Sequence, residues 1–258
     1  MHVTLALLAL LLVVLAQLIW RAVTRERRDY ARFKRLRSTK LRQQVFRRWL
    51  VESLTVLGGL AAALLLGAWA DVPLVLRDAR GWGPLAEVPY GTGTATAILV
   101  GFGVAVLVAM VLPILLLART KLDEIPAIGD IKSLLPRNRQ ELPYGAGLAV
   151  TAGVVEELLF RLGLPAAIFG ALGDHSTGSG ILAFGAAAIV FGLLHIYQGA
   201  PGILFAFLLG LVFTALYVLS GNILVPIVLH ALIDLRSLVL IPVVLGGAGT
   251  REPRTVAP

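Results

Sequence analysis

Long apolar runs separated by short polar segments make up most of the chain. Each run is close to the roughly 20 residues that an α-helix needs to cross about 30 Å of hydrocarbon. The chain is 58% hydrophobic, with a mean hydropathy of +0.87, which is more apolar than soluble domains are. The pattern predicts an all-α, polytopic membrane protein with about seven transmembrane helices, at His2–Trp20, Leu50–Ala70, Thr94–Ala118, Tyr144–Leu172, Ile181–Gln198, Ile203–Leu219 and Ile223–Leu245.

Positive charge is concentrated between the first two runs. Twelve of the 23 lysines and arginines lie in Arg21–Arg48, against only two acidic residues, Glu26 and Asp29. A basic segment beside apolar runs is typical of the cytoplasmic side of a membrane. We therefore interpret the net charge of +8 as a topology signal and expect no nucleic-acid partner. The segment is predicted to be either an amphipathic helix lying on the lipid bilayer or a solvated basic loop.

The basic segment orients the rest of the chain. Residues 21–48, 119–143 and the tail are placed in the cytoplasm, and residues 71–93 outside. The first run lacks a basic flank before it and a convincing cleavage site, so we expect a retained helix rather than a signal peptide. Arginine far outnumbers lysine, which favours a bacterial protein of the cytoplasmic (inner) membrane.

Three charged residues interrupt the fourth run. One charge at the centre of a membrane helix costs about 2.5–3.5 kcal/mol, so Glu156, Glu157 and Arg161 need a reason. Glu157 and Arg161 are four residues apart, on one helical face, where they can pair. Glu156 is rotated by about 100° from Glu157 and cannot use Arg161 as easily. We predict that Glu157 and Arg161 support a site and that Glu156 does chemistry; the alternative is that both glutamates only pack.

Two histidines and an aspartate occupy the later runs. His195 ends the sequence FGLLH, and His230 and Asp234 are four apart in HALID. These three residues and Glu156 fall near the middle of their runs, so they can converge in one buried polar site. The alternatives are a packing histidine at position 195 and a self-satisfied His–Asp pair. Two further ionisable residues lie in a loop rich in Gly and Ser, where surface exposure explains them: Asp174 and His175.

Three functions suit this set of side chains. In the first, Glu156 and His195 activate a water while His230 polarises the scissile carbonyl group. In the second, Glu156, His195, His230 and Asp234 hold a divalent metal such as zinc, whose bound water attacks. The chain has no cysteine, which excludes cysteine-ligated metals, and the absence of an HExxH pattern weakens the second option without excluding it. The third is a proton or ion pathway, because buried Glu–His–Asp chains also mark transporters.

The order of three motifs resembles a known family. EExxxR at Glu156–Arg161, FxxxH at Phe191–His195 and HxxxD at His230–Asp234 resemble the CPBP family of CAAX prenyl endopeptidases and bacteriocin-processing (Abi) proteins. The similarity covers roughly Pro143–Leu240. It implies a glutamate-type intramembrane endopeptidase without a cofactor, in which Glu156 and His195 activate water and His230 and Asp234 line the oxyanion side.

The resemblance also sets the expected organisation and substrates. Residues 143–245 would form the catalytic membrane core, residues 1–142 an amino-terminal membrane region of three helices, and residues 246–258 a short tail. The expected partners are membrane-embedded or lipid-linked protein segments. Asp234 stands where eukaryotic CAAX enzymes usually carry Asn, so its role is open between protonated donor, orienter of His230 and metal ligand. A metal-dependent hydrolase and a non-catalytic immunity or scaffold protein remain the alternatives.

Overall fold

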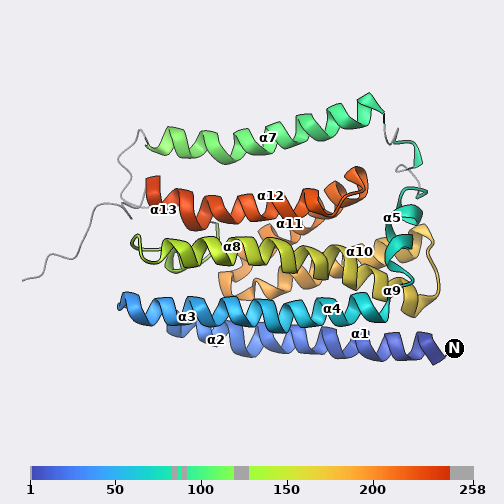
Figure 1. The fold of residues 1–258 in the computed structure, drawn as a ribbon, viewed down its shortest axis with the longest axis horizontal. Coiled ribbons are helices and arrows are strands. Elements are labelled where there is room, and N and C mark those ends of the chain that lie inside the picture. The colour runs from blue at the N-terminus through green and yellow to red at the C-terminus, as the bar shows by residue number, and fades with distance from the viewer. Residues whose placement is uncertain (1, 83–85, 89–91, 119–127, 245–258) are drawn as a thin grey trace, which may run out of the picture.

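The computed structural model describes residues 2–82, 86–88, 92–118 and 128–244, and every regular element in these ranges is helical. Figure 1 shows the long helices lying side by side as one bundle, with the amino terminus at one end and the turn between α2 and α3 at the other. This architecture confirms the all-α membrane fold. The predicted tail, residues 246–258, lies outside the described residues.

The amino-terminal half contains two long, nearly continuous helices. The first joins α1 (His2–Trp20) through the π-helical turn η1 (Arg21–Glu26) to α2 (Arg27–Phe33). The second joins α3 (Thr39–Glu52) through the π-helical turn η2 (Ser53–Leu57) to α4 (Gly58–Gly67). Two further helices, α5 (Val72–Ala79) and α7 (Gly93–Ala118), follow in the chain.

The carboxy-terminal half begins with a short 3₁₀ turn, η3 (Lys132–Leu134). The helix that carries the two glutamates is built from α8 (Leu142–Glu157), the π-helical η4 (Leu158–Gly163) and α9 (Leu164–Leu172). The remaining elements are α10 (Thr177–Leu194), the 3₁₀ turn η5 (Ile196–Gln198), α11 (Gly199–Ser220), α12 (Leu224–Leu235), the π-helical η6 (Arg236–Leu240) and α13 (Ile241–Val244).

Five of the described helical segments are long and apolar enough to cross a membrane: residues 4–33, 39–67, 177–194, 196–220 and 224–244. The protein is therefore a multi-pass membrane protein, but the predicted number of seven spans is not confirmed. The predicted spans at 94–118 and 144–172 are also helical, though neither is among these five. The second of them carries three charged residues, which lower its mean hydropathy.

Residues 21–48 are helical on both sides of a turn, so the interpretation as a solvated loop is wrong, and the interpretation as a helix on the bilayer stays a prediction. The segment is the helical extension of the first two spans, which turn back on each other at residues 34–38. Its aromatic side chains are buried: Phe33 packs against Phe46 and Trp49, with ring centroids 5.1 and 4.8 Å away. These rings are covered by protein, because they pack on one another and on Tyr144 and Leu148 of α8.

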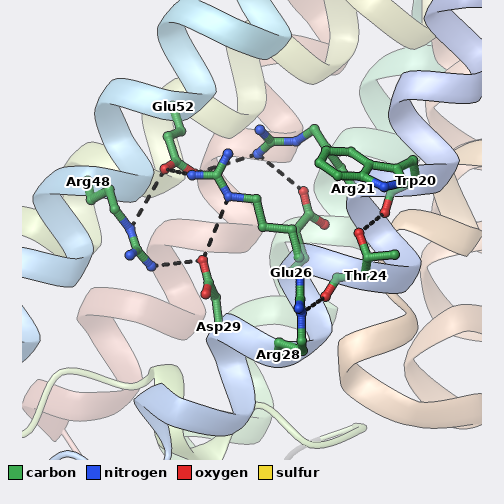
Figure 2. Close-up of polar contacts among 9 residues, drawn as sticks. Trp20, Arg21, Thr24, Glu26, Arg28, Asp29, Arg48 and Glu52 are labelled. Atoms are coloured by element: carbon green, nitrogen blue, oxygen red, sulfur yellow. Dashed lines mark hydrogen bonds and ion pairs between the residues drawn. The ribbon is translucent and has the colours of Figure 1, made fainter.

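Opposite charges neutralise part of this hairpin (Figure 2). Arg25 Nη2 lies 2.5 Å from Glu52 Oε1, and Arg48 Nη2 lies 2.9 Å from Asp29 Oδ2. Arg21, only 5% exposed, lies 3.5 Å from Glu26 and 3.7 Å from Glu52. The few acidic residues of the segment are thus placed between its helices, where they hold the arginines together.

The loop before α10 is more structured than its sequence predicts. His175 was expected to be exposed, but Nδ1 lies 2.6 Å from Asp78 Oδ2 of α5, and its carbonyl accepts a 3.0 Å hydrogen bond from Trp82. Asp174 accepts hydrogen bonds from the Ser179 and Ser176 hydroxyl groups at the start of α10, and these bonds lower the pKa of Asp174. The loop therefore joins α5 to α10.

A close helix crossing positions the carboxy-terminal half. A Cβ atom at Gly153 of α8 would lie 2.8 Å from the backbone nitrogen of Ala231 and 3.0 Å from the carbonyl oxygen of Ile227, both on α12. Only glycine permits the two backbones to approach this closely. The contact lies one turn before Glu156 and Glu157 on α8 and beside His230 on α12. It brings residues that are more than 70 positions apart in sequence to the same point.

Candidate functional site

The site is centred on the end of α8, where α-helix changes to the π-helical turn η4. Glu156 and Glu157 are the last two residues of α8, and Arg161 lies within η4. Short π-helical turns inside α-helices are frequent at functional sites because they shift the direction of the following side chains. The two glutamates differ in burial: the Glu157 side chain is 0% exposed, whereas that of Glu156 is 19% exposed.

Glu157 and Arg161 form the ion pair that their spacing predicts. Arg161 Nε lies 3.1 Å from Glu157 Oε2, and the Arg161 side chain is 1% exposed. Arg161 Nη2 also donates a 3.3 Å hydrogen bond to the carbonyl oxygen of Gly210 on α11. The guanidinium carbon lies 4.4 and 5.2 Å from the ring centroids of Phe191 and Phe213. Arg161 therefore ties three helices around one buried carboxylate; its supporting role in catalysis stays a prediction.

Glu157 also binds His230, a contact that residue spacing does not predict. His230 Nδ1 lies 2.6 Å from Glu157 Oε1, and the imidazole stacks on Phe213 at 4.9 Å with an interplanar angle of 17°. A carboxylate only accepts, so Nδ1 carries the proton of this bond. No local sequence signal could reveal the pair, because its members are 73 positions apart.

The other nitrogen of His230 faces two more carboxylates. Nε2 lies 3.9 Å from Glu156 Oε2 and 3.7 Å from Asp234 Oδ2. Both distances exceed a hydrogen bond, yet all three groups point at one place. The Asp234 and Glu156 side chains are 33% and 19% exposed, against 7% for His230. The structure thus brings Glu156, His230 and Asp234 together, with the carboxylates on the more open side.

His195 lies at a helix end and not in the middle of a span, so that expectation is wrong. It directly follows α10, which ends at Leu194, and the backbone then turns through η5. His195 Nδ1 lies 2.8 Å from the carbonyl oxygen of Phe191. A carbonyl can only accept, which assigns the proton of neutral His195 to Nδ1 and leaves the Nε2 lone pair available.

The Phe191 ring links the two histidines. Its centroid lies 5.0 Å from the His195 ring and 5.9 Å from the His230 ring. Within the described residues, His195 makes no hydrogen bond or ion pair with Glu156, His230 or Asp234. The two imidazoles therefore border the same region without touching.

The candidate metal ligands do not form a ligand group in this arrangement. Among the residues that the structure describes, no three His, Asp or Glu side chains are placed to hold one metal ion. The metal-dependent reading of Glu156, His195, His230 and Asp234 stays a hypothesis for experiment.

The segment that contains the site matches a known protein family. Residues 138–236 match the family model described as type II CAAX prenyl endopeptidase, Rce1-like. The matched range contains all three motifs and confirms the family that they indicate. Comparisons with curated proteins and with solved structures gave no match.

Proposed function

We propose that this chain, which belongs through residues 138–236 to the CAAX prenyl endopeptidase family, is an intramembrane endopeptidase that uses a water activated by Glu156 and His195. One observation carries the proposal. His230 is anchored through Nδ1 by the buried Glu157, and its Nε2 faces the more exposed carboxylates of Glu156 and Asp234. A histidine held at one nitrogen and open at the other is arranged to donate or accept a proton at a substrate.

The first step is attack on the scissile carbonyl group. The Glu156 carboxylate removes a proton from water, and the His195 Nε2 lone pair accepts a hydrogen bond from the same water. The oxygen–carbon bond forms as the carbonyl π-bond opens, and the resulting oxyanion accepts a hydrogen bond from His230 Nε2–H. Protonated His230 has both nitrogens as donors, one held by Glu157 and the other directed at the oxyanion.

The second step cleaves the peptide bond. The tetrahedral intermediate collapses, the carbon–nitrogen bond breaks, and Glu156 returns its proton to the leaving amine. Asp234 lies 3.7 Å from His230 Nε2, on the same face of α12, so its negative charge favours the protonated imidazole. We assign it to orientation and charge stabilisation of His230.

The proposed substrates are membrane-associated segments, including lipid-linked carboxyl termini. The reacting groups lie within a bundle of helices of membrane-spanning length, and large apolar side chains are exposed along those helices. A substrate that reaches Glu156 and Asp234 therefore has an apolar stem or a lipid chain. The proposed location is a bacterial inner membrane, supported by the arginine-rich composition.

Glu156→Gln tests the reaction directly. The purified protein in liposomes is incubated with a farnesylated CAAX peptide and with an apolar peptide without lipid. Because the amide cannot act as a base, cleavage should fall by about 10²–10⁴-fold. Glu87→Gln, an exposed residue far along the chain from the motifs, is the matched control and should cleave like the wild type. Equal cleavage by wild type and Glu156→Gln would contradict the mechanism.

Adding a chelator to the same cleavage assay tests the metal-dependent alternative. Loss of cleavage in chelator, with recovery on adding zinc, would replace the direct Glu156 mechanism by the metal-dependent form. A wild type that binds the peptides without cutting either would favour the non-catalytic immunity or scaffold protein.

A further inference from the structure

The backbone turn that follows His195 is held by parts of the chain outside the family match. The turn η5 contains Tyr197, whose ring stacks on the His195 imidazole at a centroid distance of 6.1 Å and an interplanar angle of 27°. Gln198 closes the turn by donating its backbone N–H to the His195 carbonyl oxygen at 2.8 Å. The direction of the His195 ring thus depends on where this turn lies.

The outer side of Tyr197 is covered by Tyr30 from α2. The two rings meet edge to face, with centroids 5.2 Å apart and an interplanar angle of 64°. Tyr30 is 3% exposed, and its hydroxyl donates a 2.5 Å hydrogen bond to the carbonyl oxygen of Asp130. Both ends of the Tyr30 side chain are therefore fixed, the ring by Tyr197 and the hydroxyl by the loop.

The loop that receives Tyr30 also binds the turn itself. The Asp130 backbone N–H donates a 2.9 Å hydrogen bond to the Gln198 carbonyl oxygen. Gly129 before it has a φ of +75°, and a Cβ there would lie 2.9 Å from the same oxygen. Lys34, the residue directly after α2, pairs with Asp130 at 2.6 Å. Helix α2 and residues 129–130 therefore hold η5 from two directions.

We propose that Tyr30 is a positioning residue for His195, acting through Tyr197 and the loop at residues 129–130. The inference rests on the proposed function, because it matters for catalysis only if His195 orients the attacking water. The proposal assigns a function to the first 140 residues, which lie almost entirely outside the family match. They help to position a side chain of the site that residues 156–234 form.

The physical reason is that, among the described residues, one hydrogen bond holds the His195 ring. The Nδ1 contact with the Phe191 carbonyl fixes one point of the imidazole, but rotation about that point moves Nε2. The face of Tyr197 restricts the rotation, and Tyr30 prevents Tyr197 from moving away. A displacement of about 1 Å at a reacting group can cost up to about 100-fold in rate.

The test compares Tyr30→Leu, Tyr30→Phe and the control Phe33→Leu. Phe33 lies one turn away on the same helix, is 1% exposed, and packs on Phe46 and Trp49 rather than on the turn. It therefore reports the cost of losing a buried ring from the hairpin alone. We expect Tyr30→Leu to lower kcat about tenfold with KM within about twofold. Tyr30→Phe keeps the ring and should recover most of kcat, and Phe33→Leu should leave kcat within about twofold.

A second measurement is independent of turnover. The chain has four histidines, so ¹⁵N-histidine spectra are simple, and the His195 signals are identified by their loss in His195→Gln. The wild type and Tyr30→Phe should show one Nδ1–H tautomer, whereas Tyr30→Leu should shift or broaden the His195 signals alone.

The outcomes separate this inference from the proposed function. Unchanged His195 signals in Tyr30→Leu, or equal losses of kcat in Tyr30→Leu and Phe33→Leu, would overturn the positioning role. The wild type could instead cleave nothing while the His195 signals shift only in Tyr30→Leu. That result would support the positioning of His195 by Tyr30 and overturn the hydrolytic function.

Discussion

The described part of the chain contains two buried arginine–glutamate pairs with the same surroundings. Arg42 of α3 pairs with Glu141 at 3.0 Å, and its guanidinium lies 4.3 and 5.4 Å from the rings of Phe33 and Phe46. Arg161 pairs with Glu157 at 3.1 Å and lies over two phenylalanine rings at 4.4 and 5.2 Å. All four charged side chains are at most 1% exposed.

The pairs differ in what else their carboxylates bind. Both oxygens of Glu141 face Arg42 Nε, at 3.0 and 3.1 Å, and Oε2 also accepts from the Arg137 backbone N–H at 3.0 Å. Glu157 Oε1 accepts the hydrogen bond from His230, whereas Glu157 Oε2 faces Arg161 but accepts no hydrogen bond from the residues that the structure describes. The first pair connects α3 to the segment before α8. The second connects the buried charges to a histidine that can exchange protons.

Removal of the Glu157 charge should have the largest effect. Glu157→Gln keeps an acceptor for His230 Nδ1–H but leaves Arg161 buried without a counter-charge. We expect a stability loss of about 3–5 kcal/mol, measured by denaturant titration in detergent. Cleavage per folded molecule should fall about 100-fold, because His230 loses the carboxylate that stabilises its protonated form.

The double variant Arg161→Met/Glu157→Gln distinguishes the two effects. It removes both charges, so most of the stability should return while cleavage stays low. Full cleavage in Glu157→Gln would show that the second pair is as purely structural as the first.

Removal of the Glu141 charge should affect stability alone. Glu141→Gln leaves Arg42 buried without a counter-charge. We expect the free energy of unfolding to fall by about 3–5 kcal/mol in the same titration. Because neither residue contacts the candidate site in the described part of the chain, kcat per folded molecule should stay within about twofold of the wild type. Arg42→Met/Glu141→Gln keeps the oxygen that accepts from Arg137 and should recover most of the stability. A fall in kcat as large as that of Glu157→Gln would remove the distinction between the pairs.

A pair with one exposed partner, Arg77, supplies the lower limit of the comparison. Arg77 Nε donates a 2.7 Å hydrogen bond to Asp78, and this bond lowers the pKa of Asp78 from its ordinary 3.8; burial opposes the shift and the contact with His175 adds to it. A lowered folded-state pKa stabilises the fold above pH 3.8, and the stabilisation is lost as the pH falls through the folded pKa. Asp78→Asn should therefore lower the melting temperature by no more than about 2 °C at pH 7, because exposed pairs contribute little.

The difference between wild type and Asp78→Asn should shrink in melts taken below pH 3.8. A difference that is independent of pH would assign the effect to packing of the His175 loop rather than to the charge.

The residues of the second pair were predictable because they are local. Glu157 and Arg161 are four apart, and an isolated charge in an apolar helix requires a partner. The convergence of Glu156, His230 and Asp234 was also predictable in outline, from their placement in neighbouring apolar runs. The first pair was not, because Arg42 and Glu141 are 99 positions apart and each lies in a segment with ordinary surface charges.

Sequence patterns did not show what covers a segment that is polar on one side and aromatic on the other. Tyr30, Phe33 and Phe46 among arginines suggest a helix lying on lipid, since burial against protein and against lipid leave the same pattern. The position of His195 was misjudged for a similar reason: an apolar run does not reveal that its helix ends at Leu194.

The sequence by itself determined the all-helical membrane architecture, the family motifs and the partner of Arg161. These follow from hydrophobic run length, from residue spacing and from the cost of a lone charge in an apolar helix. Only the tertiary structure decided which carboxylate holds His230, which nitrogen of each histidine is open and what supports the turn after His195. Those contacts depend on helices that cross at one small residue, such as Gly153 against Ala231, and the crossing sets distances of a few ångströms that no linear spacing encodes.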